Sequence, residues 1–294
     1  MKTRGMANTI LLLFLVLLAP GAAAQSGAND RGKGAPVAST AFLERLAFQL
    51  YSSRNFPPLE AQLSVLAGLG YEAVEFGAGS GSAADMKELL DRHGLKSPSG
   101  HFDLELLRSD PASVVARAHL FGMDVVAIAY LPPEARPKDS EGWLALGREL
   151  QDFAELLGKH DLKLAWHTHD FEFEKLPDGS YPLDRMFEAA PSLFWQPDIG
   201  WLTRAGQDPY SWLERYLDRV RTVHLKDVAA EPDNGEGGWA DIGYGTVDWT
   251  RLLPLLAGAE IGALIVEHDD PSDFVRFARR SRATVAAWPS TQAE

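Results

Sequence analysis

The chain has 294 residues, of which 46% are hydrophobic and 23% charged, a composition typical of a folded globular protein with a sizeable core. Its formal net charge is -13, and an acidic surface repels nucleic acids and anionic lipids, which argues against nucleic acid as a partner. Because the chain contains no cysteine, it can form neither a disulfide nor a thiolate metal site, so any metal must be bound by nitrogen and oxygen ligands.

The first 24 residues have the pattern of a secretory signal peptide. Lys2 and Arg4 precede the apolar run 10–19, and small residues follow up to Ala24, where we expect cleavage. An uncleaved membrane anchor is the alternative, but the run is shorter than the about 20 residues that a spanning helix needs. The leader predicts a periplasmic or secreted protein that is not attached to the membrane after cleavage.

Residues 25–40 are small and polar, as in a flexible linker, and we expect a single domain over residues 41–288. From residue 46 onward, short apolar runs alternate with amphipathic segments. The predicted strands are 46–51, 73–76, 95–100, 125–130, 163–167, 193–197, 220–225 and 263–267. The predicted helices are 59–69, 84–93, 111–121, 143–159, 183–190, 209–217, 249–257 and 271–286.

Eight such strand-helix units predict an α/β protein with a closed (β/α)8 barrel, the TIM barrel. An open, doubly wound sheet is the alternative. The chain has no Gly-x-Gly-x-x-Gly after the first strand, the feature that would favour a nucleotide-binding open sheet.

Ionisable residues gather where the predicted strands end. They are Glu75, His101, His167 with His169, Asp198, His224 and Glu267. The carboxyl ends of parallel barrel strands meet at one mouth, where active sites lie. Three imidazoles and several carboxylates brought together there would repel one another or lose solvation unless a cation neutralised them. The pattern therefore predicts a divalent metal site.

Two local patterns bear on the orientation of these side chains. His167 and His169 are two residues apart, so on an extended strand both point to the same face and can enter the barrel mouth, unless they form a surface pair on a loop. Asp198 follows Pro197 and precedes Gly200, a context that also suits a helix-capping aspartate.

The last two strands end in charged side chains. His224 and Lys226 share a face by the same period of two, and Lys226 suits either a substrate oxygen or a simple salt bridge to Asp227. Glu267 ends an apolar run typical of a buried strand, where a carboxylate needs a partner. We expect Glu267 and Asp269 to face inward.

Aromatic residues lie near the same strand ends. Trp201 and Trp239 are the best candidates for stacking on the apolar face of a sugar ring, although tryptophan serves equally well in packing.

Five motifs together resemble the sugar phosphate isomerase/epimerase families with the xylose isomerase-like barrel. They are Trp166-His167-Thr168-His169-Asp170-Phe171-Glu172-Phe173, Gln196-Pro197-Asp198-Ile199-Gly200-Trp201, Val223-His224-Leu225-Lys226-Asp227, Gly243-Tyr244-Gly245-Thr246-Val247-Asp248-Trp249 and Val266-Glu267. The likeness spans about residues 46–285. The resemblance implies one metal ligand from each of the last four strands, commonly Glu, Asp, His and Glu, which here are His167, Asp198, His224 and Glu267. His167 departs from that pattern, which puts an epimerase mechanism with two glutamate bases in doubt.

The resemblance implies an isomerase or epimerase that uses Mn, Zn, Co or Mg and forms an enediolate from a free sugar, keto-sugar or cyclitol. We predict Glu267, His169 and Glu75 as catalytic residues, and His101, Trp201 and Lys226 as substrate-binding residues. A lyase or dehydratase, a keto-glycoside cleaving enzyme and a non-catalytic carbohydrate-binding barrel are the alternatives. A homo-oligomer is left open.

Overall fold

The computed structural model describes residues 40–56, 58–258 and 260–289, which all belong to one compact unit of the chain, Pro36–Glu294. The predicted signal peptide, and the predicted linker up to residue 39, lie outside the described residues. Among the residues that are described, no helix is long and apolar enough to cross a membrane.

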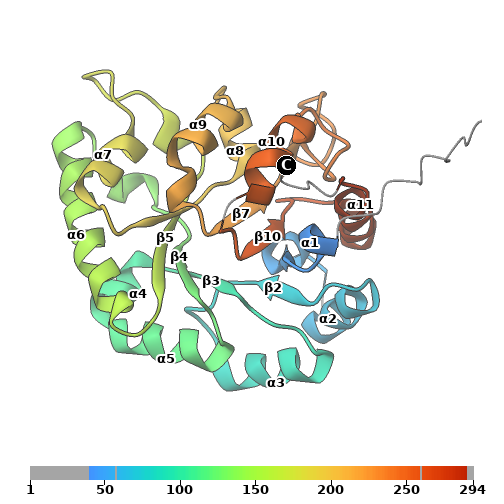
Figure 1. The fold of residues 1–294 in the computed structure, drawn as a ribbon. Coiled ribbons are helices and arrows are strands. Elements are labelled where there is room, and N and C mark those ends of the chain that lie inside the picture. Colours follow the sequence, from blue (N-terminus) through green and yellow to red (C-terminus); the bar gives the residue numbers. More distant parts are fainter. Residues whose placement is uncertain (1–39, 57, 259, 290–294) are drawn as a thin grey trace, which may run out of the picture. The chain divides into compact units, whose positions relative to one another are not determined.

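The predicted barrel is confirmed (Figure 1). Eight parallel strands form it: β1 Leu46–Gln49, β2 Ala73–Glu75, β3 Ser99–Phe102, β4 Val125–Ile128, β5 Lys163–His167, β6 Phe194–Gln196, β7 Thr222–Leu225 and β10 Ala263–Val266. They pair in the orders β2-β1-β10-β7 and β3-β4-β5-β6. Parallel bridges join the two sheets, from Gly77 to His101 at one seam and from Asp198 to His224 at the other. The strands therefore close into a ring, and the open-sheet alternative is wrong.

The eight predicted helices are present on the outside of the strands (Figure 1). They are α2 Leu59–Gly68, α3 Ala83–His93, α5 Pro111–Phe121, α6 Ser140–Gly158, α7 Pro182–Ala189, α9 Pro209–Tyr216, α10 Trp249–Gly258 and α11 Phe274–Ala286. Their ends follow local chemistry. The Ser82 hydroxyl accepts a hydrogen bond from the Asp85 amide at the start of α3, and Gly94 ends that helix in the left-handed conformation that favours glycine.

Several elements were not predicted. They are the helices α1 Thr40–Leu43, α4 Leu104–Ser109 and α8 Ile199–Arg204, the 3-10 turns η1 Leu50–Ser53, η2 Pro133–Ala135, η3 Phe171–Phe173 and η4 Leu217–Arg219, and the antiparallel pair β8 Asp227–Val228 and β9 Trp239–Ala240. These elements are short, and most of them shape the loops that follow the barrel strands.

The alternation of side chains along the strands places the polar residues inside the barrel. Phe48 packs on Phe277 of α11, toward the helices, so its neighbour Ala47 faces the barrel interior, where it clusters with Ala263 and Ile265. Gln49 and Glu267 follow Ala47 and Ile265 by two residues and therefore continue on the interior face. Small residues fill the lower barrel, and polar residues follow them toward the mouth.

Several predicted boundaries differ from those of the structure, and two of these differences have a clear local cause. The third strand spans Ser99–Phe102, not residues 95–100, because Pro98 has no amide to donate to the ladder, and it only accepts hydrogen bonds, from Asp124 and Val125. His101 therefore lies within β3 and not after its end. The last helix starts at Phe274 and not at residue 271, because the Asp273 carboxylate caps the amides of Val275 and Arg276.

Candidate metal and active site

Three histidines from three strands lie together at the barrel mouth. The ring centroid of His167 is 4.8 Å from that of His101 and 4.4 Å from that of His224, and the His101 and His224 rings stack at 5.3 Å and 7°. His169 follows at 4.9 Å from His167, with the two rings perpendicular. The predicted convergence of His167 and His169 on the mouth is confirmed, and the surface-pair alternative is wrong.

The four residues implied as metal ligands form one compact group. His167, Asp198, His224 and Glu267 are all buried, and each offers a ligand atom within 4.8 Å of those of the other three. His167 Nδ1 and Asp198 Oδ2 are buried without a hydrogen-bond partner among the described residues. Nitrogen and oxygen donors that converge while two of them lack a partner fit a divalent cation.

Asp198 has two roles, one for each oxygen. Its Oδ1 accepts a hydrogen bond of 2.9 Å from the Trp201 amide and so caps α8, as the helix-cap alternative expected. Its Oδ2 remains with the ligand group. Burial, with a smaller opposing effect of the Lys226 charge, raises the pKa of Asp198 to about 7. The cap fixes the carboxylate so that the second oxygen stays directed at the other ligands.

Glu75 lies beneath the ligand group and is fully buried. Its carboxylate accepts hydrogen bonds from Gln49 Nε2 at 2.9 Å, from Gln196 Nε2 at 2.9 Å and from the Ser99 hydroxyl, and it lies 2.6 Å from His224 Nε2. Burial acts to raise the pKa of Glu75, but the charges of His101 and His224 outweigh it and hold the pKa well below its usual value. Glu75 is thus an ionised carboxylate with its lone pairs occupied.

His224 is held between two carboxylates. Its Nδ1 lies 2.7 Å from Glu267 Oε2, and Nε2 is bound by Glu75. Burial acts to lower the pKa of His224, but Glu267 and Glu75 together raise it to about 10. With Nε2 directed to Glu75, Nδ1, which lies beside the other potential ligand Glu267, is the nitrogen that would bind a metal, and a carboxylate behind a histidine is a common way to orient a metal ligand.

Lys226 is buried next to three carboxylates. Its Nζ lies 2.5 Å from Asp269 Oδ1, 3.4 Å from Glu267 Oε2 and 3.6 Å from Asp198 Oδ2. Burial acts to lower its pKa, but these carboxylates raise the pKa above the ordinary value, so Lys226 is charged. The alternative salt bridge to Asp227 does not form.

Asp227 instead accepts hydrogen bonds from the Gly243 amide at 2.8 Å and from Trp249 Nε1 at 2.9 Å. It anchors the loop that carries the fourth of the resembling motifs, and it holds the start of α10 against that loop.

His169, like His167, makes no side-chain hydrogen bond among the described residues. Its Nδ1 is buried and has no hydrogen-bond partner among the described residues. Burial, reinforced by the Lys226 charge, lowers the pKa of His169 to about 3, so the ring is neutral. Its backbone amide donates at 2.9 Å to Glu172 Oε2, whose other oxygen accepts from Trp166 Nε1 at 2.8 Å. This buried bridge fixes the loop after β5.

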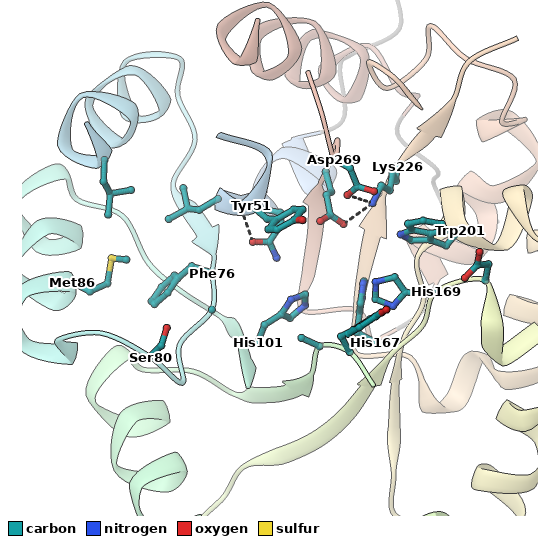
Figure 2. A pocket seen from close by; sticks show the side chains of 18 of the residues that line it. Tyr51, Phe76, Ser80, Met86, His101, His167, His169, Trp201, Lys226 and Asp269 are labelled. Atoms are coloured by element: carbon teal, nitrogen blue, oxygen red, sulfur yellow. Dashed lines mark hydrogen bonds and ion pairs between the residues drawn. The ribbon is translucent and has the colours of Figure 1, made fainter. Parts of the chain in front are cut away.

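Several of these residues line a pocket of about 850 Å³ (Figure 2). Six of the predicted site residues contribute to its wall: His101, His167, His169, Trp201, Lys226 and Glu267. Asp269 lines it too, which confirms the expectation that Glu267 and Asp269 face inward. Glu75, Asp198 and His224 lie deeper, behind this wall.

Trp239 does not line the pocket. It is 2% exposed and packs edge-on against Trp201, with centroids 4.8 Å apart. Its predicted role in sugar stacking is therefore wrong, because the β8–β9 pair folds the ring under Trp201. The sequence analysis also missed Gln196, which donates a hydrogen bond to Glu75. The sequence offered one indication of this role: Gln196 lies two residues before Asp198, so on an extended strand the two side chains point to the same face.

The sequence pattern of one protein family, described as the xylose isomerase-like TIM barrel, matches residues 63–288. The chain belongs to this family. This xylose isomerase-like protein is 28% identical over 273 residues to the rhizopine catabolism protein MocC of Rhizobium meliloti, a match that covers 78% of the chain and 82% of MocC. It is also 28% identical over 154 residues to an inosose dehydratase of Bacillus cereus, covering 45% of the chain and 49% of that enzyme. The chain thus spans about half the length of that dehydratase.

Solved structures agree on the fold of this xylose isomerase-like protein. A sugar phosphate isomerase/epimerase from Parabacteroides distasonis superposes with a TM-score of 0.70 at 19% identity, over 84% of this chain and 95% of that one. A protein named IOLI, solved with a zinc atom, superposes with a TM-score of 0.66 at 14% identity, over 84% of this chain and all of that one. At such identities the likeness establishes the barrel alone. The predicted family is confirmed, and isomerases or epimerases and dehydratases both occur among its relatives.

Proposed function

We propose that this protein is a metal-dependent enzyme that removes the proton beside the carbonyl group of a free keto-sugar or cyclitol. One observation carries the proposal: a group of four potential metal ligands with two buried atoms that lack a hydrogen-bond partner lies at the pocket that the His169 imidazole lines. A cation site and a proton acceptor side by side are what abstraction of such a proton requires.

His167, Asp198, His224 and Glu267 would hold the metal, with Mn, Zn, Co and Mg as candidates. A bound divalent cation would polarise the carbonyl oxygen and stabilise the negative charge of the enediolate. The zinc atom in the structure of IOLI supports a cation on this fold.

His169 is the proposed base. Its ring lines the pocket and makes no side-chain hydrogen bond among the described residues, so the imidazole is placed to take a proton from a bound substrate. Lys226 carries a permanent ammonium at the pocket wall and suits a substrate hydroxyl or the developing oxyanion. Glu75 lies too deep to touch a substrate, so we propose that it positions His224 instead of acting on the substrate directly.

Two overall reactions share this first step. Epimerisation needs a second base on the opposite face of the substrate, and Glu267, the pocket carboxylate that could serve, is engaged by both His224 and Lys226. Elimination needs only one base, because the electron pair of the broken C–H bond forms a double bond, and the protonated base returns its proton to the neighbouring hydroxyl group as this leaves as water. We therefore favour a lyase, and the inosose dehydratase match supports this choice. An isomerase or epimerase, in which Glu267 would be the second base, is the second candidate.

We also propose that the protein binds its substrate outside the cytoplasm, either in the periplasm or outside the cell. The support is the signal-peptide pattern of residues 1–24, together with an acidic composition that disfavours nucleic acid. Phosphorylated sugars are kept inside cells, so export favours an unphosphorylated substrate.

The testing experiment is solvent exchange. The metal-loaded protein is incubated in deuterated water with a panel of free keto-sugars and keto-cyclitols, and mass spectrometry follows deuterium uptake and loss of water. Uptake with a change of configuration supports the isomerase or epimerase, and loss of water supports the lyase. If the metal-loaded protein binds members of the panel but catalyses neither change, a carbohydrate-binding barrel replaces the proposed enzyme.

A further inference from the structure

The pocket has two chemically different ends. His169, Lys226 and Asp269 lie at one end, and Phe76 and Met86 lie at the other (Figure 2). Ser80 adds a polar side chain to the second end (Figure 2), and Leu50 and Leu59 also line the pocket. A sugar ring needs hydrogen-bond partners for its hydroxyls, and this end offers few of them. Its chemistry suits an apolar group.

The size of the pocket also exceeds what a single sugar ring fills. Its volume of about 850 Å³ lies toward the upper end of the range of about 300–1,000 Å³ found for pockets that enclose drug-sized ligands. A ring seated at the ligand group would leave the end around Phe76 and Met86 unfilled. Apolar walls gain free energy when a ligand removes them from water, so an occupant of that end would add to affinity.

Two exposed tyrosines line the same pocket. Tyr51 is 52% exposed and Tyr130 is 46% exposed, and both belong to the few large hydrophobic side chains that the described residues leave in solvent. The Arg54 guanidinium lies 3.8 Å from the ring centroid of Tyr51, and Arg136 donates at 2.9 Å to the Tyr130 hydroxyl. The Tyr130 ring centroid lies 5.2 Å from that of His169, so this tyrosine belongs to the polar end, where an exposed ring that is held in place is preorganised for stacking on a ligand.

We propose that the end around Phe76 and Met86 is a subsite for an aromatic substituent. The substrate class is then an aryl glycoside or aryl ether of the keto-sugar or cyclitol, not the free monosaccharide. The assignment of the sugar to the other end rests on the proposed function, whereas the aromatic subsite stands on its own lining residues.

The first experiment tests the subsite without any sugar. Saturation-transfer NMR measures the binding of 4-nitrophenol to the wild-type protein, to Met86→Gln and to Leu120→Gln. Met86 lies in the pocket, whereas Leu120 is an exposed side chain of α5 that does not line it, and glutamine suits both helices. We expect Met86→Gln to weaken binding about five- to tenfold, and Leu120→Gln to leave it unchanged. Absent binding, or equal binding by wild type and Met86→Gln, overturns the proposal.

The second experiment links the subsite to turnover. Phenyl and methyl glycosides of a keto-sugar whose carbonyl is not the anomeric carbon, or phenyl and methyl ethers of a keto-cyclitol, are compared by kcat/KM, and we expect the phenyl compound to be favoured by about tenfold or more. A larger kcat/KM for a disaccharide than for the phenyl glycoside would assign the second end to a sugar and overturn the inference. If no sugar exchanges deuterium while 4-nitrophenol still binds at Met86, the proposed reaction fails and the aromatic subsite survives.

Discussion

The two sides of the barrel mouth differ in how completely their polar atoms are satisfied. On the side of β2, β7 and β10, Glu75, His224, Glu267 and Lys226 bind one another at 2.6–3.4 Å. On the side of β5 and β6, His167, His169 and Asp198 each keep a buried polar atom without a hydrogen-bond partner among the described residues, although Asp198 Oδ2 lies 3.6 Å from Lys226 Nζ. Both sides are equally interior, so burial alone does not explain the difference.

The difference distinguishes polar atoms that maintain the geometry of the site from polar atoms that are left to bind a ligand. A buried polar atom without a partner costs about 1–3 kcal/mol, so three of them in one place are best explained by a ligand that satisfies them. The satisfied side gains from interactions within the protein and holds its geometry in the absence of a ligand. Substitution of Glu75, the member of the satisfied side that is neither a proposed metal ligand nor part of the pocket wall, should therefore affect stability, whereas substitutions on the side of β5 and β6 should affect ligand binding and turnover.

The largest expected effect is on metal content. We predict that Asp198→Asn reduces the bound divalent metal from about one ion per chain to almost none, because the ligand group loses its charged oxygen. Asparagine can still cap α8, so the melting temperature of the metal-free protein should change little. Elemental analysis measures the metal. Asp208→Asn, which changes the capping aspartate of α9 outside the site, is the matched control. Equal metal in wild type and Asp198→Asn would remove Asp198 from the ligand set.

The next effect is on turnover. We predict that His169→Asn lowers kcat/KM by about 10²–10⁴-fold, the usual contribution of a general base, while the metal content stays unchanged. Steady-state kinetics on a substrate found in the exchange screen measures it. His160→Asn, at an exposed position, is the control. Activity within a few-fold of wild type in His169→Asn would transfer the role of base to Glu267.

On the satisfied side we predict a loss of stability. Glu75→Gln should lower the free energy of unfolding by about 3–5 kcal/mol, because the buried His224 loses a charged partner and the new amide group faces donors on Gln49 and Gln196. Urea unfolding of the metal-free protein measures the change without a contribution from the metal. Glu72→Gln, an exposed glutamate near the start of β2, should change it little. An unaltered unfolding curve for Glu75→Gln would contradict the division between the two sides.

Much of the fold could be predicted because the barrel repeats one local pattern. The bounds of β5 and α5 agree with the sequence prediction, since apolar periodicity and a proline at the first turn determine them locally. The strand ends also gathered the site residues as expected, because parallel barrel strands bring their carboxyl ends to one mouth.

The pairing of atoms within the site could not be predicted in the same way. Glu75 and His224 are 149 residues apart, and their contact depends on side-chain conformations across strands that do not neighbour each other. No periodicity marks which imidazole nitrogen stays unpartnered. The placement of Trp239 beneath Trp201 likewise depends on the β8–β9 pair, a loop structure with no apolar repeat to indicate it.

The smallest expected effect concerns Glu172, the buried carboxyl group that supports the unsatisfied side. Burial raises its pKa to about 8, against opposing hydrogen bonds from Trp166 Nε1 and the His169 amide, whereas in the unfolded chain it titrates near 4.5. Between these pH values the folded state binds the proton more tightly, so this group stabilises the fold below about pH 4.5 and that contribution is lost as the pH rises toward 8.

Glutamine mimics the protonated group and does not titrate. We therefore predict that the stability of Glu172→Gln relative to wild type rises from pH 5 to pH 8 and then levels off, which unfolding curves at a series of pH values measure. Glu174→Gln, an exposed neighbour, is the control and should follow the wild-type pH dependence. A stability difference between Glu172→Gln and wild type that does not vary with pH would mean that Glu172 is ionised in the fold. The His169 amide would then donate its hydrogen bond to a charged carboxylate, and both sides of the mouth would be supported by charged groups.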